Sequence, residues 1–76
     1  MKITVRAYGM LHEAIGGKKW VEIDVKQGAT IDNLLEQFGL NRDNVMNVVK
    51  KGNICKWDYI IQENDELELL PVIFGG

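Results

Sequence analysis

Residues 30–39, Thr-Ile-Asp-Asn-Leu-Leu-Glu-Gln-Phe-Gly, carry the strongest structural signal in the chain. Their apolar side chains recur at i, i+3, i+4 and i+7, the spacing of one helix face: Ile31, Leu34, Leu35 and Phe38. Thr30 is a residue type that caps helix N-termini, and Gly39 is a residue type that ends helices. The pattern predicts a helix over residues 31–38, whose apolar face must be covered by a second layer of structure.

Segments on both sides of this helix alternate between polar and apolar residues, which is the period of a half-buried strand. The alternation covers residues 2–8, 19–26 and 66–70. The side chains expected to face the helix are Ile3, Val5, Ala7, Val21, Ile23, Val25, Leu67 and Leu69. We expect the first two strands to be antiparallel neighbours. The first and last strands should lie side by side in parallel, joined by a right-handed crossover.

The remaining segments are shorter and less regular. We expect a helical turn at 9–15 ending at Gly16-Gly17, strands at 45–50 and 54–56, turns at 51–53 and 62–65, and irregular packing at 57–61. The pattern does not fix the inward face of the strand at 45–50. Together the segments predict an α+β domain over residues 1–70, in which a mixed sheet of four to five strands clasps one main helix. Residues 71–76 follow as an extended tail.

The composition narrows the classes of function. A chain of 76 residues with 46% hydrophobic and 26% charged residues is typical of one small soluble domain. The nine Lys and Arg residues are scattered and outnumbered by eleven Asp and Glu, which argues against nucleic-acid binding. No apolar run approaches the roughly 20 residues that span a bilayer, and the chain opens without a signal-peptide pattern. With a single cysteine, Cys55, these features favour a cytoplasmic location.

Several side chains have both a functional and a structural interpretation, and the structural one is favoured for each. Cys55 is read as a small buried hydrophobe rather than a sulfur relay, and His12 as exposed polar filler rather than a base or ligand. Trp57 and Tyr59 are expected to complete the core rather than form a docking patch. Gly16-Gly17-Lys18 lacks the spacing of a phosphate loop and is read as a hairpin turn. A solvated face is favoured over a steering patch for Glu63, Asp65, Glu66 and Glu68.

No paired carboxylates, nucleophile triad or metal-ligand cluster is visible in the sequence, so we do not expect the chain to be an enzyme or to bind a metal or cofactor. The reactive group is instead expected at the end of the tail, where Pro71-Val72-Ile73-Phe74 precedes Gly75-Gly76. Glycines carry no Cβ, so they fit a narrow channel and leave the terminal carbonyl unhindered. The ionised carboxylate of Gly76 can attack a nucleotide α-phosphate and form an acyl-adenylate. Chance or a cloning scar are the alternative origins of two terminal glycines.

The whole chain resembles the small ubiquitin-like sulfur carriers with a β-grasp fold, typified by the small subunit of molybdopterin synthase and by the sulfur carrier of thiamine synthesis. The resemblance is carried by residues 10–16, Met-Leu-His-Glu-Ala-Ile-Gly; residues 28–31, Gly-Ala-Thr-Ile; residues 63–67, Glu-Asn-Asp-Glu-Leu; and residues 70–76, Leu-Pro-Val-Ile-Phe-Gly-Gly. The last motif is the most specific of the four.

The resemblance implies that an E1-like adenylating enzyme uses ATP to activate Gly76, which is then converted to a thiocarboxylate. It implies partner contacts for Pro71, Val72, Ile73, Phe74 and Gly75. The sulfur acceptor would be the large subunit of molybdopterin synthase or an equivalent, in molybdenum or tungsten cofactor biosynthesis, and the free carrier is expected to be a monomer.

Three alternatives stay open. The same activated terminus serves a ubiquitin-like modifier, which forms isopeptide bonds to lysines of other proteins, and a carrier of the thiamine pathway. A plain interaction module would use no covalent chemistry. The short connection Leu40–Asn44 is nearer to the thiamine carrier, whereas Pro71-Val72 is nearer to the molybdopterin synthase subunit. Phe74 is bulkier than the small residue expected before the glycines.

Overall fold

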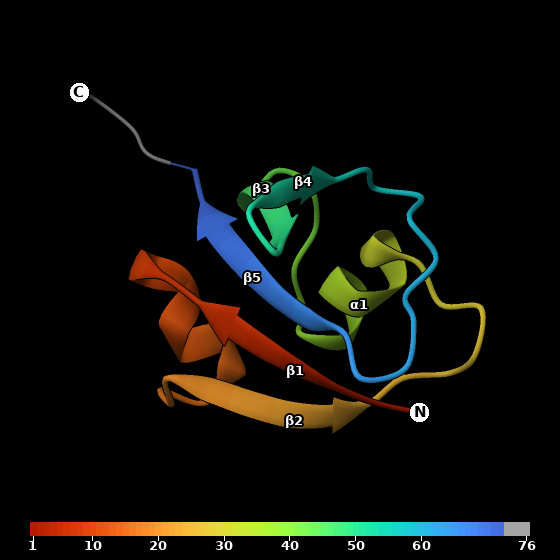
Figure 1. Cartoon of the computed structure of the whole chain (residues 1–76). Helices are drawn as coiled ribbons and strands as arrows, with labels where there is room; N and C mark the ends of the chain where they lie inside the picture. The colour runs from red at the N-terminus through yellow and green to blue at the C-terminus, as the bar shows by residue number, and fades with distance from the viewer. Residues whose placement is uncertain (73–76) are drawn as a thin grey trace.

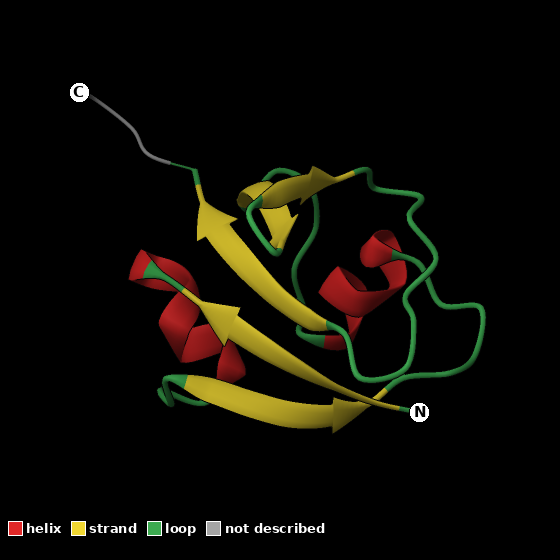
Figure 2. Ribbon diagram, in the orientation of Figure 1, coloured by secondary structure: helices red, strands yellow, loops and turns green. Residues whose placement is uncertain are grey.

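The computed structural model describes residues 1–72 of the chain. Its elements, in chain order, are β1 (Lys2–Ala7), the 3-10 helix η1 (Gly9–Ile15), β2 (Trp20–Asp24), α1 (Ile31–Gln37), β3 (Val45–Lys50), β4 (Asn53–Cys55) and β5 (Glu66–Pro71). Figure 1 shows α1 lying against the sheet on the side of β5 and β3, and Figure 2 shows η1 beside β1 and β2. The predicted arrangement of one mixed sheet clasping one main helix is confirmed.

The sheet has five strands in the order β2-β1-β5-β3-β4. Strands β1 and β5 are parallel neighbours, as predicted, and the register pairs Val5 with Leu67 and Ala7 with Leu69. Strand β2 is antiparallel to β1, and β3 is antiparallel to both β5 and β4. Parallel neighbours need a crossover long enough to return the chain to the same end of the sheet, and α1 lies in the connection that provides it.

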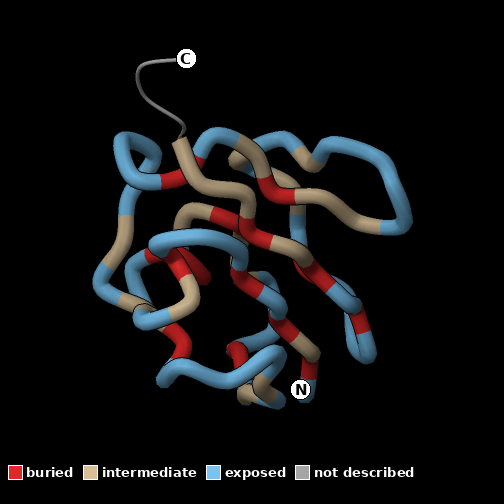
Figure 3. Tube along the Cα trace, turned by 90° about the vertical axis from the view of Figure 1, so that its left-hand side faces the viewer, coloured by how far each residue is buried: buried red, intermediate tan, exposed pale blue. Residues whose placement is uncertain are grey.

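The core lies between the sheet and the helices, and buried positions alternate along the central strands (Figure 3). The predicted inward residues of β1 and β5 are all buried, as is Val25. Val21 and Ile23 pack against the core but are only partly buried. They belong to β2, which is an edge strand and therefore has a neighbouring strand on one side only.

Helix α1 begins with a capping box. The backbone N–H of Asn33 donates to Thr30 Oγ1 at 3.2 Å, and the backbone N–H of Thr30 donates to Asn33 Oδ1 at 3.0 Å. This reciprocal pair satisfies two backbone donors that a helix start otherwise leaves free. The helix ends one residue earlier than predicted, because Phe38 has φ −94° and ψ 6° and serves as the C-cap. Gly39 follows with φ +74°, a conformation that favours glycine.

Strand β3 shows why its inward face could not be read from the sequence. The buried residues Val45 and Val48 are three positions apart, whereas a regular strand buries every second residue. A register shift between Val45 and Asn47 accounts for the extra residue. The following turn is made by Lys51 and Gly52, both with positive φ, and β4 begins at Asn53, one residue before its predicted start.

The predicted helical turn at residues 9–15 is η1, and it contributes Leu11 and Ile15 to the core. Gly16 and Gly17, with φ +87° and +73°, end it and lead into β2. The interpretation of this glycine pair as a turn is confirmed.

One member of the acidic set is not solvated. Asp65 is 5% exposed, and its Oδ2 accepts hydrogen bonds from the Tyr59 hydroxyl at 2.7 Å and from the backbone N–H of Gln62 at 2.9 Å. Its Oδ1 lies 2.7 Å from Lys50 Nζ, which also donates to the Tyr59 hydroxyl at 2.8 Å. The expectation of a solvated face was therefore wrong for Asp65, because this carboxylate joins β3 to the turn that starts β5.

The protonation states of this cluster favour the ion pair. Burial raises the pKa of Asp65, but the hydrogen bonds from Lys50, the Gln62 amide and Tyr59 outweigh it and hold that pKa below its ordinary value. Hydrogen bonds to Asp65 and Tyr59 raise the pKa of Lys50. The pair therefore stays charged across the neutral pH range.

We expect Asp65→Asn to lower the free energy of unfolding at pH 7 by about 2–3 kcal/mol, since Lys50 and Tyr59 lose a charged acceptor. A carboxyl with a depressed folded-state pKa contributes stability above its unfolded pKa of about 3.9 and loses it as the pH falls through the folded pKa. The advantage of the wild type over the variant should thus shrink below about pH 4.

Urea unfolding at pH 7 and pH 3 measures both effects. Glu63→Gln, in the same turn but at an exposed position, is the matched control and should change stability by less than about 0.5 kcal/mol. An advantage that persists unchanged at pH 3 would contradict the assignment.

Candidate functional site

The tail is the site that the sequence predicts, and the structure describes its first two residues. Pro71 is the last residue of β5, so the strand runs one residue further than predicted, and Val72 follows it. Both are partly buried. We call these two residues the tail base. Ile73, Phe74, Gly75 and Gly76 lie outside the described residues, so their predicted roles stay predictions.

The connection between β1 and η1 holds one side of the tail base. Because β1 and β5 are parallel, both end at the same edge of the molecule (Figure 1). The backbone N–H of Tyr8 donates to the Leu69 carbonyl at 3.2 Å, which extends the pairing beyond β1. The Tyr8 hydroxyl donates to Glu68 Oε2 at 2.7 Å, and this bond raises the pKa of Tyr8. Tyr8 is thus fastened to β5 through both its backbone and its side chain.

Strand β3 holds the other side. Val45 is the register partner of Pro71, and the irregularity between Val45 and Asn47 lies next to this pair. Proline has no N–H to donate, so it is tolerated where the ladder is interrupted. The tail therefore leaves the domain from a base that is flanked by β3 and by the β1–η1 connection.

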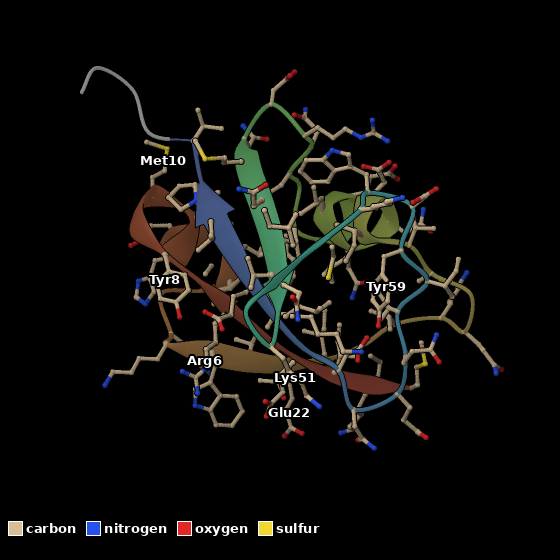
Figure 4. All side chains as sticks on the ribbon, turned by 45° about the horizontal axis from the view of Figure 1, so that its top comes forward. Arg6, Tyr8, Met10, Glu22, Lys51 and Tyr59 are labelled. Atoms are coloured by element: carbon tan, nitrogen blue, oxygen red, sulfur yellow. The ribbon has the colours of Figure 1, made fainter. Side chains whose placement is uncertain are left out.

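Exposed apolar side chains lie on the elements that flank the tail base. Met10 is 69% exposed, and Figure 4 shows it beside the end of β5. Tyr8 is 42% exposed and lies along β5, where its hydroxyl bonds Glu68. Met46, next to Val45 in β3, is 48% exposed. Exposed apolar side chains that gather at one place are typical of protein contact surfaces, and the flexible thioether of methionine adapts to different partners. These three residues and the tail base form what we call the exit surface.

The structure places the other candidate residues away from reactive roles. Cys55 is partly buried and packs against the core, and burial raises the pKa of its thiol, with the Asp65 carboxylate adding to the shift. His12 is partly buried in η1 rather than fully exposed as predicted, because η1 lies against β1 and β5. Residues 1–72 contain no group of His, Cys, Asp and Glu side chains that is able to hold a metal ion. Within the same residues, no helix is long and apolar enough to cross a membrane.

Trp57 and Tyr59 pack against the core, which confirms the structural interpretation of these aromatic residues. The Arg42 guanidinium lies 5.6 Å from the centroid of the Trp57 ring and makes an ion pair with Asp32 at 2.6 Å. These contacts attach the loop after α1 both to the first turn of α1 and to the segment that follows β4.

The residues around the tail base were not among the predicted site residues: Tyr8, Gly9, Val45 and Met46. A signal for the first two was present, because the predicted parallel pairing of the first and last strands puts the residues after Ala7 beside those after Leu69. Val45 and Met46 had no such signal, since the register of β3 depends on the irregularity between Val45 and Asn47.

Comparison with known proteins relates this arrangement to a family. The profile described as the ThiS family matches residues 5–76. The chain is similar in structure to SAMP1 from Haloferax volcanii, with 23% identity, a TM-score of 0.75 and coverage of 100% of both chains. It is also similar to a proposed molybdopterin converting factor, subunit 1, from Pyrococcus furiosus, with 17% identity, a TM-score of 0.76, and coverage of 96% of this chain and 99% of that chain.

A third similar structure is Urm1 from Trypanosoma brucei, with 15% identity, a TM-score of 0.72, and coverage of 99% of this chain and 95% of that chain. Curated protein sequences gave no match. At these identities the structural likenesses establish the fold, and the predicted ubiquitin-like β-grasp fold is confirmed.

We expect Cys55 to be slow to alkylate, because its raised pKa leaves little thiolate at neutral pH and its sulfur is partly covered. At pH 7.5, iodoacetamide should modify the folded protein at least about tenfold more slowly than the same chain in denaturing urea. Mass spectrometry over time measures both rates, and Cys55→Ser corrects for reaction at other side chains. Equal rates for the folded and unfolded chains would contradict the inert role.

Proposed function

The chain belongs to the ThiS family, and from this premise we propose that it is a sulfur carrier whose C-terminal Gly76 is adenylated and converted to a thiocarboxylate. The observation that carries the proposal is that the family match runs through residue 76 and so includes Gly75-Gly76. The family consists of small ubiquitin-like carriers and modifiers that are not themselves catalytic. We assign the carrier to molybdopterin biosynthesis in the cytoplasm.

The chemistry needs only the terminal carboxylate on this chain. One carboxylate oxygen attacks the α-phosphate of ATP, and pyrophosphate leaves. A sulfide equivalent then attacks the acyl carbon and AMP leaves, so the terminus becomes a thiocarboxylate. Two glycines leave this carbon accessible to both reagents. Holding sulfur on a protein arm also presents it to the acceptor at a high effective concentration.

Residues 1–72 support a role for the domain in positioning the tail that carries the reacting carboxylate. The domain fixes where the tail begins, through the pairing of Pro71 with Val45 of β3 and the close approach of Pro71 to Gly9, the first residue of η1. The exit surface offers apolar contacts to a partner at the same place. We assign adenylation to an E1-like activating enzyme and sulfur acceptance to the large subunit of molybdopterin synthase or its equivalent. Residues 71–75 would be the segment that both partners bind.

A second candidate is protein modification. The structural likeness to the small archaeal modifier protein 1 of Haloferax volcanii favours it, because that protein is named as a modifier. Activation would be the same, but the nucleophile that attacks the acyl carbon would be a lysine amine of another protein instead of a sulfide equivalent. A carrier of the thiamine pathway would differ from the leading proposal only in the final sulfur acceptor.

Intact-protein mass spectrometry tests the leading proposal. The chain is expressed with its activating enzyme, ATP and a sulfur donor, and we expect a mass increase that matches the replacement of one oxygen by sulfur, located at Gly76. A variant that lacks Gly75-Gly76 is the control and should keep its unmodified mass. An unmodified wild-type mass with an active enzyme would overturn the carrier role, and conjugates of higher mass that need both glycines would support the modifier instead.

Gly76→Ala should leave stability unchanged but slow activation. Within residues 1–72 the last buried side chain is that of Leu69, and we expect the melting temperature to change by less than about 2 °C. A Cβ next to the reacting carbonyl crowds the attack, and we expect adenylation to slow by at least about tenfold. Differential scanning fluorimetry and pyrophosphate exchange measure the two effects. A large loss of thermal stability would show that the terminus takes part in the fold.

A further inference from the structure

We propose that Gly9 is a positioning residue for activation of the tail, because the absence of a side chain at position 9 is what allows Pro71 to occupy its place at the tail base. The inference rests on the proposed function. It concerns a residue near the other end of the chain from Gly76, at the first position of η1.

The proposal rests on the contact that a side chain at position 9 would make with Pro71. A Cβ built on Gly9 would lie 3.1 Å from Pro71 Cγ and 3.8 Å from Pro71 Cβ. The first distance is shorter than the roughly 3.5–4.0 Å of favourable carbon contacts, whereas the second is ordinary contact. A Cβ would meet nothing within 4 Å at the other glycines of residues 1–72, which are Gly16, Gly17, Gly28, Gly39 and Gly52.

Pro71 has little freedom to move away from such a side chain. Its ring fixes φ near −65°, and Val45 is its register partner on the side of β3. On the side of Gly9, the hydrogen bond from the Tyr8 N–H to the Leu69 carbonyl holds the β1–η1 connection against β5. A side chain at position 9 therefore requires Pro71 to shift by a few tenths of an ångström, and because of these pairings we expect the end of β5 to take up the shift.

Turning the end of β5 changes the direction in which the tail leaves the domain. The five residues that follow Pro71 reach at most about 17 Å when extended, so an activating enzyme has to receive the tail close to the exit surface. An enzyme that binds both the domain and the tail needs a fixed relation between them, and small misplacements of a reacting group are costly in rate. Gly9 should thus affect the chemical step more than docking.

The test is pyrophosphate exchange by the activating enzyme at varied concentrations of the carrier. For Gly9→Ala we expect kcat to fall about tenfold, with KM for the carrier changed by less than about twofold. Gly17→Ala is the matched control. Gly17 also has a positive φ, +73° compared with +56° for Gly9, but a Cβ built on Gly17 would meet nothing within 4 Å. Both variants force alanine into a left-handed conformation and should lower the melting temperature by about 4–8 °C, but only Gly9→Ala should lower kcat.

A rescue variant isolates the contact with Pro71. Pro71→Ala removes Cγ and leaves only the 3.8 Å contact, so in the Pro71→Ala background the substitution Gly9→Ala should change kcat by less than about twofold. Gly9→Asn serves if Gly9→Ala does not fold, since asparagine tolerates positive φ while still carrying a Cβ. It should show the same loss of kcat and the same rescue.

Three results would overturn the inference, and they are distinguishable. Equal kcat values for the Gly9 and Gly17 variants would remove the special role of Gly9 and leave the proposed function standing. A loss of kcat that persists in the Pro71→Ala background would show that Pro71 does not transmit the effect. No exchange with the wild-type chain and an active enzyme would overturn the proposed function itself, and the role of Gly9 with it.

Discussion

The parallel pairing of β1 with β5 is the constraint from which the rest of the molecule follows. It joins the first and last strands at the middle of the sheet, so the chain between them must cross over one face, and α1 lies in that crossover. It also brings the carboxyl ends of both strands to one edge of the domain. The residues after Ala7 and the residues after Leu69 thus meet there, although more than sixty positions separate them in sequence.

Hydrogen bonds and an ion pair with other parts of the chain hold both ends of β5 in place. At its start, the Asp65 carboxylate is held by Tyr59, Gln62 and Lys50, which ties the turn before β5 to β3. At its end, Tyr8 binds Leu69 through its backbone and Glu68 through its hydroxyl. The strand that carries the tail is therefore fixed at both ends by groups from other parts of the chain. The position from which residues 71 and 72 leave the sheet is thus set by the contacts at both ends of β5.

The sequence was most informative where local pattern and packing agree. Helix α1 and strands β1, β2 and β5 have clean periods, and their boundaries were predicted to within two residues because the core faces of these elements are regular. The inward face of β3 was not predictable, since the register shift after Val45 follows from how β3 meets Pro71. The burial of Asp65 was missed for a similar reason, because its partner Lys50 is fifteen positions away and reaches it only when β3 and β5 are paired.

The Lys50 side chain has one more chemical consequence. Its hydrogen bonds to Asp65 and Tyr59 raise the pKa of its ammonium group, so almost none of it is present as the free amine at neutral pH. Only the unprotonated amine attacks an activated acyl group. The network that anchors the turn before β5 therefore also makes Lys50 a poorer nucleophile toward acyl groups than a lysine with an ordinary pKa.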